Sequence, residues 1–438
     1  MYSLSKYVQS YKVSEEDALL YDSVKGNAFL IKSHLISVDG SNVVASKEIE
    51  EFLRLRICDV PDKKEVRGVY ESKNKLYISL ETFLRCNLAC PYCYQVNNSY
   101  SKKSISRENL DLLFLYIQKV YSKTHFEILN FKILGGEPSV DWSPGAYILE
   151  NVSCFCKTNG IKLDLYIDTN GTLIKDFLLL SGYDSLTFNV PLCYEECHNK
   201  YRSYKNGRGT YRTIIENVNS LSTLSKIKIL LRHNTDSYNV NFFDVYLKDL
   251  KKSLTFEPII MPFYTTDPVR GDYKNPFSYF DYVDWRSSKC ISGLIESGFN
   301  VNFSPRTYLE GECQQQSKYS LKLFSSGKVG ACAVNFFDED NPFLSEIMEG
   351  ELISIERYWG GAKGIKVLRD SYKCRDCKSL YTCLGDYNLP CIKKLGIKEC
   401  APERNVYLNL GLYFSELYRY YCKGKGNKFK AINIFDLR

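Results

Sequence analysis

The sequence contains no long apolar run. No segment approaches the roughly 20 consecutive apolar residues that a membrane-spanning helix needs, and Met1 to Lys12 lacks the basic and then apolar order of a signal peptide. The chain also has no internal repeat and no low-complexity segment. These absences argue against a membrane or secreted protein and predict a cytoplasmic one.

Charge of one sign is not concentrated anywhere either. The formal net charge of +7 is spread over short clusters instead of one long basic block, so nothing demands nucleic acid as a partner. Hydrophobic residues make up 44% and charged residues 25% of the chain, which is ordinary for a soluble fold and unlike a disordered one. A length of 438 residues predicts two or three domains.

The first part of the chain, residues 1–75, is predicted to be a small α+β module. Three strand-like runs separated by turn-forming residues occupy 8–13, 18–21 and 29–34. Apolar residues at helical spacing follow from 46 to 57, with Ser46 placed as the cap.

Residues 76–285 alternate between strand-like and helical patterns. The six candidate strands occupy 76–80, 131–134, 163–167, 185–190, 226–231 and 258–262. Such alternation predicts an α/β fold with a parallel sheet, open or partly closed into a barrel, and functional loops at the carboxyl ends of its strands. Residues 286–410 are rich in Cys and Gly with short elements, a composition usually organised by metal. Residues 411–438 are predicted to form a C-terminal helix and a basic tail.

Seventeen cysteines stand in this chain. The cytosol keeps thiols reduced, so a disulfide framework is excluded and metal ligation is the leading explanation. Cys86, Cys90 and Cys93 follow the first strand of the predicted sheet with three and two residues between them. Three thiolates in this pattern can hold an iron-sulfur cube and leave one iron open. Zinc would need a fourth His or Cys nearby, and none lies between Cys93 and His125.

This cysteine loop resembles the signature of the radical S-adenosylmethionine (SAM) superfamily, and the resemblance extends in order through residues 76–285. It implies a partial (β/α)6 barrel and a 4Fe-4S cluster on the three cysteines, which binds SAM and cleaves it to a 5′-deoxyadenosyl radical. Tyr92 matches the position whose backbone meets the adenine. The run Gly135-Gly136-Glu137-Pro138 is similar to the family's loop for the SAM ammonium group, since glycines let the backbone approach and Glu137 supplies a compensating charge.

Later strand ends extend the same resemblance. In Asp168-Thr169-Asn170-Gly171, Thr169 and Asn170 match the family's segment near the SAM ribose. Asn189 stands where relatives often have a SAM-contacting Ser, and Arg232 is a candidate partner of the SAM carboxylate.

The fourth strand departs from the family's pattern. Relatives often have Ser-Leu-Asp-Gly-Pro there, whereas this chain has Asn-Val-Pro-Leu-Cys from 189 to 193. The usual acid is missing, so its catalytic role cannot be carried over. His198, Tyr201 and Arg202 do resemble what usually follows.

Seven further cysteines closely resemble a SPASM extension, which holds one or two auxiliary 4Fe-4S clusters and would bring the total to three. By this resemblance an outer cluster would be held by Cys374, Cys377, Cys383 and Cys400, and an inner one by Cys313, Cys332 and Cys391. The inner cluster is one thiolate short. Either Cys290 or Cys422 completes it, or its iron stays open for a substrate thiolate. The gap between Cys383 and Cys391 is longer than usual.

The remaining cysteines are expected to be small core residues; they are Cys58, Cys154, Cys156, Cys193 and Cys197. Cys193 is the exception, because it follows the fourth strand and could reach the barrel mouth. It is therefore a candidate catalytic thiol.

The resemblance favours a maturase of ribosomally made peptides, served by a flavodoxin or ferredoxin type electron donor. Residues 1–75 resemble the winged-helix-like leader-binding domain of such maturases, where the leader of a precursor peptide adds as a strand to the sheet edge and packs on the helix; the alternative is a structural cap. A thioether from a substrate cysteine is the favoured product, with a carbon-carbon crosslink or epimerisation as alternatives.

Two other functions are weighed. Anaerobic sulfatase-maturing enzymes share this fold, but they carry a Cys at the position of Tyr319 and an Asp at that of Ala333, and both departures count against this function. A non-catalytic iron-sulfur electron carrier would leave Gly135 to Pro138 and the Asn170 loop without purpose.

Overall fold

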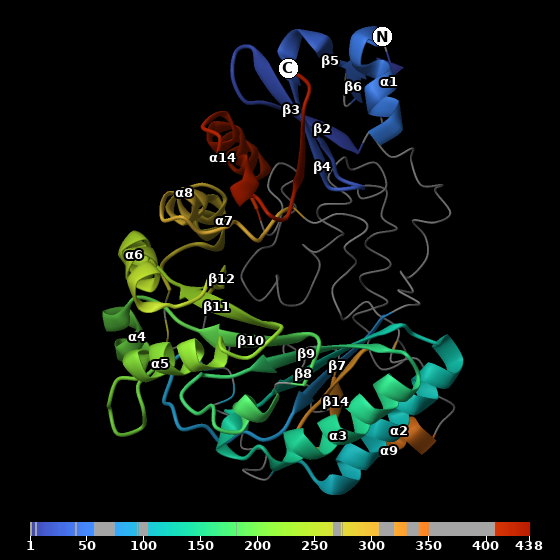
Figure 1. Cartoon of the computed structure of the whole chain (residues 1–438), viewed down its shortest axis with the longest axis vertical. Coiled ribbons are helices and arrows are strands. Elements are labelled where there is room, and N and C mark those ends of the chain that lie inside the picture. The colour runs from blue at the N-terminus through green and yellow to red at the C-terminus, as the bar shows by residue number, and fades with distance from the viewer. Residues whose placement is uncertain are drawn as a thin grey trace. The chain divides into compact units, whose positions relative to one another are not determined.

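The chain folds into two compact units (Figure 1). The computed structural model describes residues 2–4, 7–39, 42–56, 75–93, 95, 104–180, 182–265, 273, 275–305, 319–330, 341–349 and 408–438. The first unit consists of residues 1–70, 277–312 and 363–438, and the second of residues 71–276 and 313–362. Residues from both ends of the chain thus share one unit. A division of the sequence into consecutive segments did not anticipate this arrangement.

The second unit is built on a sheet of eight strands in the order β12-β11-β10-β9-β8-β7-β13-β14. Its six parallel strands are β7 (Lys75–Glu81), β8 (Ile128–Leu134), β9 (Lys162–Asp168), β10 (Leu186–Pro191), β11 (Ile227–Thr235) and β12 (Ile259–Tyr264). These are the six strands predicted from the sequence, and the α/β fold with a parallel sheet is confirmed. Strand β13 (Leu321–Leu323) pairs in parallel with β7, and β14 (Val329–Gly330) closes the edge antiparallel to β13.

Helices cover the outer face of this sheet (Figure 1). They are α2 (Arg107–Thr124), α3 (Ser143–Thr158), α4 (Glu195–Tyr201), α5 (Tyr211–Leu221), α6 (Phe243–Ser253) and, beside α2, α9 (Leu344–Glu349). Helix α2 begins where the hydroxyl of Ser106 accepts a hydrogen bond from the amide of Asn109, as an N-cap does. The strand residues that face the helices are fully buried and apolar, as Phe131, Leu165 and Leu231 show. This layer is the hydrophobic core of the unit.

The opposite face of the same strands is polar and only partly buried. Because side chains alternate along a strand, the residues between the apolar ones share this inner face, and they include Lys132, Asp168, Asn189, Arg232 and Asn234. A buried parallel sheet usually reads as a continuous apolar run. Polar residues on the inner face therefore mark a surface that no other layer of the second unit covers in the part of the chain that the structure describes.

The first unit contains two small sheets and the helix predicted after them. One sheet has the order β15-β4-β3-β2 and the other β1-β6-β5. The predicted strands and helix correspond to β2 (Val8–Lys12), β3 (Asp17–Asp22), β4 (Asn27–Lys32) and α1 (Lys47–Arg56). Short strands not predicted from the sequence are β1 (Tyr2–Ser3), β5 (Ile36–Asp39) and β6 (Asn42–Ala45).

The C-terminal part contributes a helix and a strand to this unit. Helix α14 (Leu410–Cys422) buries Tyr413, Phe414 and Tyr420, in agreement with the predicted aromatic helix. It packs with α7 (Tyr279–Ser287) and α8 (Lys289–Glu296). The predicted basic tail includes a strand, β15 (Asn433–Asp436), which pairs in parallel with β4.

Most of the predicted SPASM region, residues 286–410, lies outside the described residues. So do all seven of its cysteines, from Cys313 to Cys400, and the auxiliary clusters therefore stay a prediction. Among the described helices, none is both long and apolar enough to cross a membrane.

Candidate functional site

Three loops meet at the carboxyl ends of the first three parallel strands. The amide of Gly136, after β8, donates to the carbonyl oxygen of Phe83 at 2.7 Å, and the amide of Glu137 donates to that of Arg85 at 2.9 Å. The loop after β8 is therefore bonded along the segment that leads directly to Cys86. No side chain is needed for this contact, because backbone groups make it.

The two glycines of this loop are required by the close approach. A Cβ on Gly135 would lie 2.7 Å from the carbonyl oxygen of Phe83, and one on Gly136 would lie 2.2 Å from that of Arg85. Any side chain at either position would displace backbone. Pro138 is buried and begins a short 3-10 helix, η3 (Pro138–Val140), as its fixed φ favours.

Glu137 joins the second loop to the third. Its carboxylate is completely buried and accepts hydrogen bonds from the Thr169 hydroxyl at 2.7 Å, from the Ser139 hydroxyl at 2.6 Å and from the backbone amides of Ser139 and Asn170. Burial raises the pKa of Glu137, and these bonds act against the rise. Its predicted contact with the SAM ammonium group stays a prediction.

Asn170 joins the third loop to the cysteine loop. Its side-chain nitrogen Nδ2 donates to Asn87 Oδ1 at 2.8 Å and lies 3.7 Å from Cys86 Sγ. Its Oδ1 accepts from the backbone amide and the hydroxyl of Thr172. Asn87 in turn donates to the Thr172 hydroxyl at 2.8 Å. Thr169 and Asn170 are both buried, so these predicted site residues hold the three loops in one network.

The thiols of Cys86, Cys90 and Cys93 are partly exposed on this network. Burial is the main cause that raises the pKa of Cys86 and raises that of Cys93 to about 11. The charges of Glu137 and Cys90 add to the rise at Cys86, those of Cys90 and Cys86 add to the rise at Cys93, and backbone amides act in the opposite direction. The three thiols are thus close enough to influence one another. Among the described residues, no group of three or more His, Cys, Asp or Glu side chains could hold a single metal ion.

Arg202 lies beside the cysteine loop. It is 7% exposed, its guanidinium is bonded to the Tyr92 side chain, and the charges of Cys90 and Cys86 act on it. Its Nε has no hydrogen-bond partner among the described residues. Tyr92 packs against the rings of Tyr201 and Tyr273, at centroid distances of 6.2 and 5.3 Å. A buried cation with an unused donor is a ready partner for an anion.

Asn189 and Arg232 lie around a different group, the carboxylate of Asp168. Asn189 donates to Asp168 at 2.9 Å, and the Lys132 ammonium lies 3.2 Å from the same carboxylate. Burial acts to raise the pKa of Asp168, but the charges of Lys132 and Arg232 outweigh it and hold the pKa below its ordinary value. The Arg232 guanidinium also lies 5.7 Å from the Phe263 ring. Any contact of Asn189 or Arg232 with SAM stays a prediction.

Cys193 is buried, with 5% of its surface exposed. Burial raises the pKa of this thiol, and the neighbouring Cys197 adds to the rise. The structure thus places Cys193 among core residues, where its predicted catalytic role is not tested.

No family model matches the chain. A curated relative, the cysteine-type anaerobic sulfatase-maturating enzyme of Clostridium novyi (strain NT), is 26% identical over 209 residues, which make up 45% of this chain and 55% of the relative. The chain therefore spans about half the length of the curated relative it matches. Among solved structures, native anSMEcpe with bound AdoMet (SAM) and Kp18Cys peptide has a TM-score of 0.54 at 17% identity, covering 81% of this chain and 99% of that one.

The chain has the fold of a radical SAM maturase. Polyhistidine-tagged anSMEcpe with bound AdoMet gives a TM-score of 0.52 at 17% identity, over 82% of this chain and 100% of that one. Streptococcus suis SuiB bound to precursor peptide SuiA covers 94% of this chain and 99% of its own, at 14% identity and a TM-score of 0.48.

The residues of the site fit the groups that a radical SAM fold implies. Three thiols on one loop suit an iron-sulfur cube with one open iron. The unused Nε of Arg202 beside them suits a carboxylate. The glycine loop approaches the segment that leads to Cys86, where a side chain would not fit.

Several residues of the site were not assigned a role from the sequence. Asn87 and Lys132 gave no signal, because an Asn in a loop and a Lys in a strand are common. Arg202 stood in a run that resembles the family, so its buried position beside Cys90 could have been suspected. Asp168 was noted only as the start of the Asn170 loop, although a charged residue ending a buried parallel strand is unusual.

Proposed function

We propose that this protein is a radical SAM enzyme that modifies a peptide. The observation that carries the proposal is the single network in which the loops after β7, β8 and β9 are tied together around Cys86 by Asn170 and Glu137. A three-cysteine loop, a glycine loop and a buried arginine thus lie at the carboxyl ends of the strands of a parallel sheet. When bound, a 4Fe-4S cluster with SAM supplies a carbon radical that can abstract hydrogen.

The chain's own residues would orient the reactants and exclude water. Cys86, Cys90 and Cys93 would ligate the cluster, Arg202 would meet the SAM carboxylate, and the backbone at Gly135 and Gly136 would approach the rest of SAM. The backbone of Tyr92 would meet the adenine. The polar inner face around Asp168 would receive the substrate, because it is the face of the sheet that no described helix of the second unit covers.

The substrate is proposed to be a precursor peptide with a leader. A solved structure with this fold holds AdoMet together with a peptide, and the first unit has strands beside a helix, which suits strand addition by a leader. The favoured product is a thioether, formed at a substrate cysteine with help from an auxiliary cluster. A flavodoxin or ferredoxin type protein would supply electrons.

A second candidate function is sulfatase maturation. The curated relative carries that name, and the relative's match covers part of this chain. In this case the substrate would be a peptide segment of a sulfatase. The absence of Cys at Tyr319 and of Asp at Ala333 speaks for the first function.

The cluster assignment is tested by anaerobic reconstitution of the full chain. We expect about twelve irons in the wild type and about eight in the triple Cys86, Cys90 and Cys93 to Ala variant, with deoxyadenosine formation from SAM lost only in the variant. The matched control is Cys154→Ala, because Cys154 is exposed on α3. Equal deoxyadenosine formation by the triple variant would refute the proposal, and about four irons in the wild type would remove the auxiliary clusters.

Mass spectrometry of the products distinguishes the two candidate functions. A thioether retains the sulfur and loses a pair of hydrogen atoms within a cysteine-containing precursor. Conversion of a sulfatase cysteine to an aldehyde loses the sulfur. Turnover of a sulfatase peptide without turnover of any precursor would favour the second function.

A further inference from the structure

Segment 433–438 lies far from β4 in the sequence but beside it in the fold. Asn433 to Asp436 pair in parallel with Asn27 to Leu30, and the amide of Leu437 continues the pairing by donating to the carbonyl oxygen of Leu30 at 2.8 Å. Strand β15 is the outermost strand of its sheet. The segment therefore adds to the edge of a sheet made by the first residues of the chain.

Side chains of the segment contact residues of β4 and α1. We define the β4–α1 groove by Phe29, Phe52 and Arg56. The Phe435 ring stacks on that of Phe29 at 5.2 Å and 17° and meets that of Phe52 edge-on at 6.3 Å, with the Arg56 guanidinium 5.4 Å from its centroid. Leu437, two positions later, packs against the same core. The alternation of a strand thus directs an aromatic and then an aliphatic side chain into one groove.

A charged contact follows the apolar ones. The guanidinium of Arg438 pairs with Asp436 of the same segment at 2.8 Å and lies 3.7 Å from the carboxylate of Asp17, at the start of β3. Burial acts to raise the pKa of Asp17, but the hydrogen bonds from Tyr418 and Lys32 and the charge of Arg438 hold it below its ordinary value. Asp17, which also pairs with Lys32 at 3.0 Å, thus presents a carboxylate beside the basic residue at the end of the segment.

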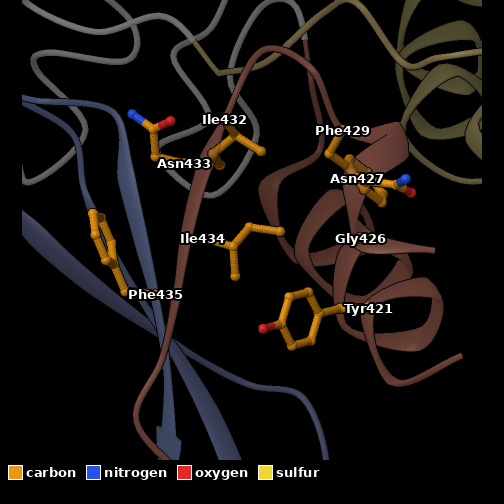
Figure 2. Close-up of a pocket in the computed structure, with 8 residues that line it drawn as sticks. All are labelled: Tyr421, Gly426, Asn427, Phe429, Ile432, Asn433, Ile434 and Phe435. Carbon is orange, nitrogen blue, oxygen red and sulfur yellow. The ribbon is translucent and has the colours of Figure 1, made fainter. Parts of the chain in front are cut away.

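The opposite side of the segment is poorly packed. Figure 2 shows Ile434 pointing away from Phe435, toward Tyr421. Ile434 lines a hollow together with Ile432, Gly426 and Phe429. No residue of β15 is buried, whereas all residues of β3 are. The segment is held by one face and a few strand hydrogen bonds, which are the contacts of a bound peptide more than those of a core strand.

We propose that the β4–α1 groove binds an extended peptide with an aromatic residue, an aliphatic residue two positions later and a basic residue after it, and that segment 433–438 fills the groove until such a peptide displaces it. Only the identity of that peptide as the leader of a substrate precursor rests on the proposed function. The internal segment competes with the peptide, so the apparent affinity equals the intrinsic affinity multiplied by the fraction of chains whose groove is empty.

The test uses the full chain and a fluorescein-labelled peptide with the sequence of residues 430–438, Lys-Ala-Ile-Asn-Ile-Phe-Asp-Leu-Arg. Fluorescence anisotropy compares wild type with Phe435→Ala, which weakens the internal occupant, and with Ile434→Ala, which alters the neighbouring residue on the opposite face. We expect Phe435→Ala to bind the peptide at least about tenfold more tightly than wild type, and Ile434→Ala within about twofold of it. A peptide with Ala in place of its Phe should lose at least about tenfold in affinity for Phe435→Ala.

Hydrogen exchange of the wild type completes the test if Phe435→Ala fails to fold. A displaceable segment exchanges the amide of Leu437 by local opening, well before the amides of β3. If the amides of Leu437 and of β3 exchange only on global unfolding, β15 is an integral strand and the proposal is overturned. Equal peptide affinity of wild type and a folded Phe435→Ala chain would also overturn it. Deoxyadenosine formation is measured separately, so a chain that binds the peptide but does not cleave SAM refutes the proposed function alone.

Discussion

The hydroxyl of Thr169 donates a hydrogen bond of 2.7 Å to the carboxylate of Glu137, across two loops that are 32 residues apart in the sequence. The carboxylate is completely buried and accepts further bonds from Ser139 and from the Asn170 amide. Every one of these partners is a donor. Hydrogen bonds to a charged acceptor are stronger than those to a neutral acceptor.

Replacing this carboxylate by an amide should therefore weaken the site without changing its shape. In Glu137→Gln the new NH2 group faces the backbone amide of either Asn170 or Ser139, so a backbone donor is left without an acceptor. We expect the free energy of unfolding to fall by about 1–3 kcal/mol, measured by urea denaturation. Ser139→Ala is the matched control, because it removes one bond and keeps the acceptor, and should cost about 0.5–1.5 kcal/mol. An equal effect of both variants would contradict the central role of Glu137.

The carboxylate of Asp168 should make stability depend on pH. Burial acts to raise its pKa, but Lys132 and Arg232 hold it below the ordinary value. A carboxylate with a lowered pKa in the folded state stabilises the fold above its unfolded pKa of about 3.9, and this contribution is lost as the pH falls through the folded value. Asp168→Asn should therefore cost about 1–3 kcal/mol at pH 7 and progressively less below about pH 4.

The comparison for this variant is Asp184→Asn. Asp184 pairs with Lys226 at the surface, where both side chains are exposed, so its thermal unfolding should match the wild type at every pH. The difference in unfolding free energy between Asp168→Asn and wild type should shrink as the pH is lowered from 7 to below about 4. If it stays unchanged, the carboxylate does not titrate as the structure implies.

Arginines at positions 202 and 232 should differ in their effect on SAM binding. The Nε of each arginine has no hydrogen-bond partner among the described residues, but Arg202 lies beside Cys90, whereas Arg232 faces Asp168 and Phe263. A lysine keeps the charge but not the planar fork. We expect Arg202→Lys to weaken SAM binding by about 10–100-fold and Arg232→Lys to change it little, measured by equilibrium dialysis on reconstituted protein. The reverse order would restore Arg232 as the carboxylate partner.

Much of the sheet could be predicted because its signals are local. Each of β7 to β12 is a short strand-like run with buried apolar residues, between turn or helix signals, and six such runs alternating with helices leave few arrangements besides a parallel sheet. The loops of the site were found for the same reason. Gly135 and Gly136 follow a strand directly, and three closely spaced cysteines follow another.

Contacts between distant segments could not be predicted. The pairing of β15 with β4 joins residues more than 400 positions apart, and four residues are too few to show a strand period beside basic neighbours. The role of Arg202 depends on α4 bringing it to the cysteine loop, which the sequence of α4 alone does not reveal. The same holds for Asp168, whose partners come from β8, β10 and β11.

Gly136 provides the sharpest test of how closely the loops approach. A Cβ at this position would lie 2.2 Å from the Arg85 carbonyl oxygen, which cannot move without displacing the chain next to Cys86. Gly136→Ala should therefore destabilise the fold by about 1–3 kcal/mol and lose SAM binding. Gly182→Ala is the matched control: nothing lies within 4 Å of its Cβ, so it should be neutral or stabilise by up to about 1 kcal/mol. If Gly136→Ala binds SAM as tightly as Gly182→Ala, the backbone contact between the glycine loop and the cysteine loop does not shape the site.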